Sequence, residues 1–180
     1  MKTNKIPVTR FSGLRSTKPK EITTLSVVLD EIKNGTYADK IHNVRKDLSK
    51  KQYLPVFTPT GQFSHRSIAG LEIYNGLVCL DVDHQKDPND LINRCKNIPW
   101  VTSAFITPSG FGVKVLIQTD ATQEDYKQVE LEVSQQFEEF TGAKRDNHCK
   151  DIARIQFVSH DPDLFINENA EIFTKQSILI

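Results

Sequence analysis

The chain has 180 residues, with 23 Lys and Arg against 23 Asp and Glu, so its formal net charge is zero. This length suits one domain, and 38% apolar with 26% charged residues is the composition of an ordinary soluble globule. Taken alone, the balance argues against attachment to nucleic acid or membrane through bulk positive charge. The apolar runs are too short for a membrane span, and the three cysteines form no C-x-x-C pair. We therefore expect a cytoplasmic protein with no membrane partner.

The charge is unevenly distributed along the chain. Residues 1–66 contain 13 Lys and Arg against 5 Asp and Glu, whereas residues 67–180 contain 10 against 18, so a charge of +8 is followed by −8. One interpretation is a set of solvated faces and a loose N-terminal arm. The other is a basic platform beside an acidic centre, which suits a polyanionic substrate only if the acids hold metal ions.

The first third of the chain predicts a small α/β unit. The expected elements are a strand at 6–11, helices at 25–33 and 38–48, and a hairpin that joins 54–57 to 62–63. Thr24 is a plausible N-cap of the first helix, and Gly35 follows its end. Turn residues at 58–61 would close the hairpin.

The remainder shows a more regular alternation. Its expected elements are a strand at 77–83, a helix at 87–97, strands at 101–106 and 113–118, a helix from 122 to about 141, and a strand at 155–159. This βαββαβ order is the ferredoxin-like unit also seen in RNA-recognition (RRM) folds. We therefore predict an α+β protein with one domain over 1–180, in which a basic N-terminal α/β unit (1–70) is joined to an RRM-like catalytic unit (71–180).

That topology predicts where polar segments meet. The first strand of such a sheet lies between the third and the fourth, so its C-terminal end adjoins the turn at 109–114 and the segment at 146–154. Alternation along the first strand puts Val78, Leu80 and Val82 against the helices. Asp81 and Asp83 would lie on the opposite, open face, and a cleft would form if the basic unit folds over it.

Asp81 and Asp83 share one strand face at the end of an apolar run. Two such carboxylates repel each other unless a cation lies between them, and oxygen ligands select Mg²⁺ or Mn²⁺. The same pair also occurs as exposed aspartates in ordinary turns, so by itself it carries little information. A third acid would complete a two-metal site, for which Asp146 is preferred over Asp151. Asp151 would instead form an ion pair with Arg154.

A glycine-rich turn accompanies the acids. Ser109, Gly110, Gly112 and Lys114, with backbone N–H groups of the turn, would form a cradle for a triphosphate. A tight hairpin explains the glycines equally well. A zinc site built on His84, His148 and Cys149 is disfavoured, because the paired ligands at short spacing that zinc sites usually show are missing.

Four short motifs in this order resemble a known superfamily. They are Leu54-Pro55 with the Thr60-to-Phe63 stretch, the stretches at 76–83 and 107–114, and the stretch from Asp146 to Pro162. The sequence is similar to archaeo-eukaryotic primase-polymerases. The closer resemblance is to the N-terminal primase-like domain of virulence-associated-E-type (VirE) proteins of mobile elements and to CRISPR-associated primase-polymerases. It spans most of the chain.

The resemblance implies a nucleotidyltransferase that uses Mg²⁺ or Mn²⁺ and copies a single-stranded DNA template. By position, Asp81, Asp83 and Asp146 match the metal-binding acids, and Ser109 and Lys114 match residues that contact the incoming nucleoside triphosphate. With them, Gly110, Gly112 and Arg154 would hold the triphosphate. Lysine at 114, where the superfamily has histidine, and Arg145 before the third acid depart from the pattern.

We therefore expect a DNA primase or polymerase domain of mobile-element, phage or CRISPR-associated replication, with a helicase domain or subunit as a further partner. The alternative is a catalytically inactive module that binds nucleic acid or nucleotide for that helicase. A metal-dependent nuclease on the same sheet ranks lower, because no histidine pair and no tyrosine placed as a nucleophile is evident.

Overall fold

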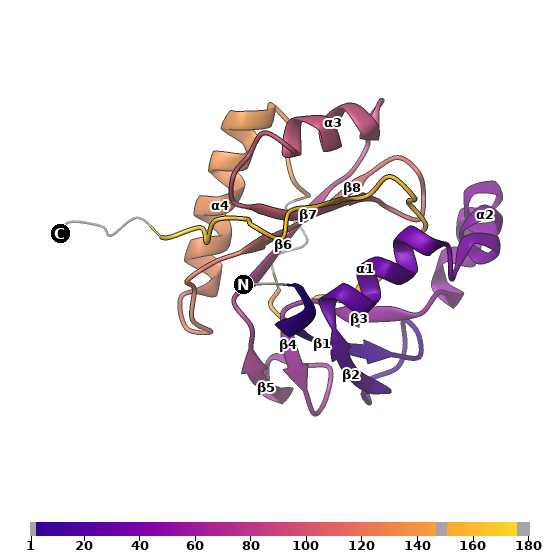
Figure 1. The fold of residues 1–180 in the computed structure, drawn as a ribbon. Helices are drawn as coiled ribbons and strands as arrows, with labels where there is room; N and C mark the ends of the chain where they lie inside the picture. Colours follow the sequence, from indigo (N-terminus) through magenta and orange to yellow (C-terminus); the bar gives the residue numbers. More distant parts are fainter. Residues whose placement is uncertain (1–2, 147–150, 176–180) are drawn as a thin grey trace.

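The computed structural model describes residues 3–146 and 151–175, which form a mixed α+β structure with antiparallel sheets (Figure 1). The N-terminal elements are η1 (Thr3–Lys5), β1 (Pro7–Phe11), β2 (Glu21–Thr24), α1 (Leu25–Asn34), α2 (Ala38–Lys46), η2 (Leu48–Tyr53), β3 (Val56–Thr58), β4 (Gly61–Phe63), η3 (Ile68–Gly70) and β5 (Leu71–Tyr74). The later elements are β6 (Leu77–Val82), α3 (Pro88–Cys95), β7 (Val101–Ile106), β8 (Val113–Gln118), α4 (Tyr126–Thr141), β9 (Gln156–Phe157) and β10 (Phe165–Ile166).

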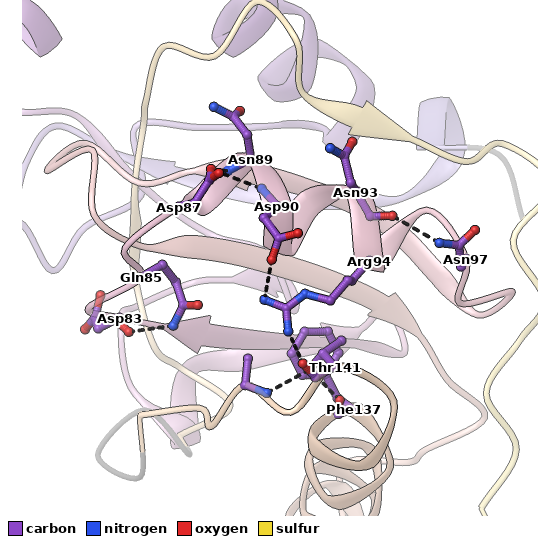
Figure 2. Close-up of polar contacts among 11 residues, drawn as sticks. Asp83, Gln85, Asp87, Asn89, Asp90, Asn93, Arg94, Asn97, Phe137 and Thr141 are labelled. Atoms are coloured by element: carbon purple, nitrogen blue, oxygen red, sulfur yellow. Dashed lines mark hydrogen bonds and ion pairs between the residues drawn. The ribbon is translucent and has the colours of Figure 1, made fainter.

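The central sheet has the order β10-β7-β8-β6, with antiparallel neighbours. The predicted adjacency of its first and third strands is confirmed by the β6–β8 pair. Helices α3 and α4 cover one face, where Val78, Leu80 and Val82 are buried as the alternation predicted (Figure 1). Helix α3 begins as predicted, because the Asp87 carboxylate accepts hydrogen bonds from two backbone N–H groups of its first turn (Figure 2).

The predicted fourth strand of this sheet is wrong. Strand β9 pairs with β3 in a second sheet of order β2-β1-β3-β9, and the outer edge of β7 is occupied by β10. The reason is apolar packing on the N-terminal unit. Val158 is buried in the core around α1, and its N–H donates to Pro55 O at 3.2 Å.

The predicted hairpin between 54–57 and 62–63 is also wrong. Strand β3 pairs with β1 and β9, whereas β4 pairs with β5. A buried hydroxyl on β1 holds β4 away from β3: Thr9 Oγ1 donates to Gly61 O at 2.8 Å and accepts from Phe63 N at 3.0 Å. The turn residues at 58–61 therefore carry the chain from one sheet to another.

The second face of the central sheet is covered by the N-terminal unit over most of its length. Leu77, Cys79 and Leu116 lie in one buried cluster with the apolar face of α1, whose Leu25, Leu29 and Ile32 recur at helical spacing. Segments 1–70 and 71–180 thus share a hydrophobic core. The predicted open face is reduced to its polar end, at Asp81. Among the described residues, no helix is both long enough and apolar enough to cross a membrane.

Candidate active site

The polar end of the central sheet is built on a cross-strand pair. Asp81 on β6 lies directly opposite Lys114 on β8, and Lys114 Nζ forms an ion pair with Asp81 Oδ2. Both side chains are largely buried, at 14% and 9% exposed. Because side chains alternate along a strand, both Asp81 and Lys114 point away from α3 and α4. The buried apolar cluster that covers Cys79 on this face does not include them. The result is a charged pair at the end of an apolar layer.

Asp83 continues this polar end just beyond β6. It packs against Gly112, because a Cβ on that glycine would lie 2.8 Å from Asp83 Oδ1. The chain then turns through His84 in the left-handed region (φ 58°), and Gln85 Nε2 donates to Asp83 O at 3.0 Å (Figure 2). Gln85 N also donates to Phe111 O at 2.8 Å, which ties this turn to the glycine-rich turn. Asp83 is thereby held beside Asp81.

The electrostatics around Asp83 favour an added cation. Loss of hydration at the cavity raises the pKa of the Asp83 carboxyl, and the charge on Asp81 raises it further. Lys114 and Lys51 lower the pKa, and Asp146 raises it. The net direction of the pKa shift is upward, chiefly because the Asp83 carboxyl is partly withdrawn from water.

Asp146 approaches the same place along the backbone. Its N–H donates to Asp81 O at 2.7 Å, and its charge acts on Asp83. The preceding residue, Arg145, forms a buried ion pair with Glu130 of α4, from Nε to Oε1 at 3.2 Å, with 4% and 2% of the side chains exposed. Arg94 of α3 also donates to Thr141 O at the end of α4 (Figure 2). These contacts fix the segment that brings Asp146 to β6.

A cavity of about 70 Å³ opens at this polar end. We call it the acidic cavity, after Asp81 and Asp83 in its lining. It is lined by Lys51, Asp81, Asp83, Thr107, Pro108, Lys114, Arg154, Ile155, Gln156 and Phe157. Lys51, Lys114 and Arg154 thus face two carboxylates across a small space. Lys51 comes from η2 in the basic N-terminal unit, and its Nζ lies 5.1 Å from the centroid of the Phe157 ring. The predicted cleft under the basic unit is therefore present, although it is small.

Reasoning from the sequence did not single out Lys51, Thr107 or Gln156 as cavity residues. Lys51 could have been suspected, since it belongs to the basic cluster that ends there. Gln156 gave no such signal. It is 3% exposed and lines the cavity, and its buried Oε1 has no hydrogen-bond partner among the described residues.

The glycine-rich turn differs in part from the predicted cradle. Gly110 N donates to Thr107 O at 2.9 Å, and Ser109 Oγ lies 3.1 Å from Thr107 Oγ1, so these polar groups are engaged within the turn. Ser109, Gly110 and Gly112 lie outside the cavity lining, and Gly110 is next to Arg45 of α2. Arg45 Nε is 3.6 Å from the position that a Cβ on Gly110 would take. Arg45 is thus another cation that sequence reasoning missed.

The Asp151–Arg154 ion pair is wrong for the part of the chain that the structure describes. Asp151 Oδ1 accepts from Ala153 N at 2.8 Å, and the residue lines a separate pocket beside Tyr126. Arg154 is free to line the acidic cavity instead. His148 and Cys149, considered for zinc, lie outside the described residues.

The donors at the cavity fit a hard divalent cation. Mg²⁺ in nucleotide enzymes usually takes one or two carboxylates and completes its shell with water and substrate phosphates. Asp81 and Asp83 supply that minimum, since both line the cavity. Within residues 3–146 and 151–175, no three His, Cys, Asp or Glu side chains form a ready-made metal site.

A family model described as the N-terminal domain of BT4734-like proteins matches residues 49–165. The chain belongs to this BT4734-like family. The matched range contains every residue that lines the acidic cavity, together with Asp146 and the glycine-rich turn. Arg45 and α1 precede it. No curated protein and no solved structure matches the chain significantly.

Proposed function

We propose that this domain is a metal-dependent nucleotidyltransferase of the primase-polymerase type, which adds nucleotides from a nucleoside triphosphate along a single-stranded DNA template. The observation that carries the proposal is the acidic cavity, where Asp81 and Asp83 face Lys51, Lys114 and Arg154. Paired carboxylates beside clustered cations are the combination that a metal-bound triphosphate requires. The resemblance of its motifs to those of primase-polymerases, and an RRM-like arrangement of the catalytic unit, belong to the same proposal.

The residues divide by charge. Asp81 and Asp83, with Asp146 beside them, would hold Mg²⁺ or Mn²⁺. Lys51, Lys114 and Arg154 would neutralise the triphosphate, and Arg45, which lies beside Gly110, and Ser109 of the same turn would contact a phosphate that extends toward the glycine-rich turn. Gly112 has no side chain to displace Asp83, since a Cβ there would meet its carboxylate. Lys114 contacts Asp81 and can exchange that carboxylate for a phosphate oxygen.

The reaction forms one bond and breaks one. The 3′-oxygen of a primer or of a first nucleotide attacks the α-phosphorus of the incoming triphosphate. The bond between the α-phosphorus and the bridging oxygen to the β-phosphorus breaks, pyrophosphate leaves, and the hydroxyl proton passes to solvent. The cation supplies activation of the hydroxyl and stabilisation of the pyrophosphate. The protein's cations bind and orient the phosphates around that chemistry.

One contact favours the alternative, a catalytically inactive module that binds nucleic acid or nucleotide. The carboxylate of Asp81, which the enzyme needs as a metal ligand, is engaged by Lys114. A lysine that permanently neutralises this acid would leave an anion-binding pocket without a metal. Such a module would bind nucleotide in EDTA as well as in Mn²⁺.

Template extension with labelled nucleotides and Mn²⁺ tests the proposal. Wild type should incorporate label, and Asp81→Asn with Asp83→Asn should reduce incorporation by at least roughly a hundredfold, as expected for loss of metal ligands. Asp163→Asn is the matched control, because Asp163 is exposed and lies outside the cavity.

Two outcomes would overturn the proposal. Equal incorporation by wild type and the double variant would remove the acids from catalysis. No incorporation by either, with nucleotide binding that EDTA leaves unchanged, would favour the inactive module.

A further inference from the structure

The basic N-terminal unit carries an exposed aromatic side chain between two grooves. Tyr53, the last residue of η2, is 74% exposed. It lines a groove of about 490 Å³ with Arg15 and Gln52, and a second of about 340 Å³ with Lys40 and Lys50. The Tyr53 ring is therefore accessible from two concave surfaces, and its apolar faces are available to pack against a ligand.

The charge around Tyr53 has one sign. Arg15, Lys40 and Lys50 contribute to the two groove linings, and no acidic residue lines either groove among the described residues. The one acid within η2's cap, Asp47, is engaged at the N-terminus of that turn, where its Oδ1 accepts from Ser49 N at 3.1 Å. The surface is therefore complementary to a polyanion.

The same short helix connects this surface to the acidic cavity. η2 supplies Lys51 to the cavity, and its next residues, Gln52 and Tyr53, line the grooves. A nucleic-acid strand bound in the grooves would therefore pass close to Lys51, which lines the cavity where we propose that nucleotide and template meet.

We propose that the grooves on either side of Tyr53 bind single-stranded DNA, with a base stacked on the Tyr53 ring and the adjacent phosphates held by Arg15, Lys40 and Lys50. Proteins that bind single strands combine a cationic groove with aromatic rings on which bases stack. A duplex keeps its bases inside and cannot use the ring. The inference rests on the proposed function, since it assigns a path to the template of that same site.

Fluorescence anisotropy with a labelled oligothymidylate, in EDTA and without nucleotide, tests the path independently of catalysis. Tyr53→Ala should weaken binding roughly tenfold, whereas Tyr53→Phe, which keeps the ring, should stay within about twofold of wild type. Phe140→Ala is the matched control, because Phe140 is 60% exposed on α4 and lines neither groove. Its affinity should equal that of wild type.

The charged residues give a second readout. Lys40→Ala and Lys50→Ala should each lower the slope of log affinity against log salt by about 0.7, the value for one phosphate contact on a single strand. Lys96→Ala, an exposed lysine that contacts Asn93 on α3, should leave the slope unchanged. Circular dichroism of each variant checks that the fold is intact.

Binding of the oligonucleotide that Tyr53→Ala leaves unchanged would overturn the inference, as would equal affinity for a duplex of the same length. Either result would leave the proposed nucleotidyl transfer standing. Conversely, the Tyr53→Ala variant could lose binding while wild type incorporates no nucleotide. That result would support the single-stranded DNA path and contradict the proposed nucleotidyl transfer.

Discussion

Lys114 and Asp81 lie opposite each other on β8 and β6, and they form an ion pair in the lining of the acidic cavity. Both side chains are mostly withdrawn from water, at 9% and 14% exposed. The pair places a cation where a metal ion would otherwise neutralise the acid. The two ligands that we propose for this site would each have to break this ion pair. A divalent cation would compete with Lys114 for the Asp81 carboxylate, and a triphosphate would compete with Asp81 for the Lys114 ammonium group.

Lys114→Met should raise the affinity of the protein for Mn²⁺ in the absence of nucleotide. The substitution removes the Lys114 charge that competes with a metal ion at Asp81, and a gain of about 1 kcal/mol corresponds to roughly fivefold tighter binding. With a nucleoside triphosphate as the titrant, affinity should fall instead. Calorimetric titration measures both. Lys114→Arg keeps the charge and should resemble wild type, and Mn²⁺ binding that weakens in Lys114→Met would contradict the competition.

Arg145→Met should destabilise the protein by about 3–5 kcal/mol, because it breaks the buried ion pair between Arg145 and Glu130 by removing one of its two members. A double variant in which Glu130→Met accompanies it should recover most of the loss, since two apolar side chains of similar volume replace the buried pair. Urea denaturation of wild type, both single variants and the double variant measures the coupling. Additive losses would mean that the two residues act separately.

Gly112→Ala and Gly110→Ala should have different effects: the first should lower Mn²⁺ affinity, and the second should lower only the stability of the glycine-rich turn. A Cβ at 112 would lie 2.8 Å from Asp83 Oδ1 and 3.1 Å from Val82 O, so the carboxylate must move, and Mn²⁺ affinity should fall severalfold. Gly110 has φ +84°, and a Cβ there would make only ordinary van der Waals contacts with the Arg45 side chain, at 3.6 and 3.9 Å. Its substitution should lower the free energy of unfolding by about 1–2 kcal/mol and leave Mn²⁺ affinity unchanged. Equal effects on affinity would remove the special role of Gly112.

The stability of the protein should fall at alkaline pH in a way that depends on Cys95. Burial of Cys95, the last residue of α3, in the core under the central sheet raises the pKa of its thiol to about 12, from an ordinary value of 9.0. Because the folded pKa is raised, the contribution is complete below pH 9 and is lost as the pH rises toward 12. The stability advantage of wild type over Cys95→Ala should therefore shrink between pH 7.5 and 10 in urea denaturation. A constant difference would contradict this.

Local sequence signals were enough for most helices and strands. Asp87 followed by proline marks the start of α3, Gly35 and Gly142 in left-handed conformation end α1 and α4, and alternation identified the buried face of β6. These features depend on contacts within a few residues, and they are therefore written in short stretches of sequence. Helix α4 begins at Tyr126 rather than at 122, because the Asp125 carboxylate accepts from Thr122 N and holds the preceding residues in a turn.

The candidate site was anticipated in part. Asp81, Asp83, Lys114 and Arg154 do line one cavity, because strand pairing alone puts Asp81 opposite Lys114. Asp146 reaches β6 through its backbone. Ser109 and Gly110 do not line the cavity, since hydrogen bonds within the turn direct their polar groups elsewhere. No local sequence pattern distinguishes a turn whose polar groups bind a ligand from one whose polar groups form hydrogen bonds within the turn.

The sequence by itself determined the α+β class, the uneven charge and the acidic strand end. Only the tertiary structure decided that β9 pairs with β3, that the N-terminal unit shares a core with the central sheet, and that Lys51 and Gln156 face Asp81. Pairing of a two-residue strand is decided by apolar packing with residues some hundred positions away, as between Val56 and Phe157. Hydrophobic burial is non-directional, so it leaves no local pattern from which the partner can be read.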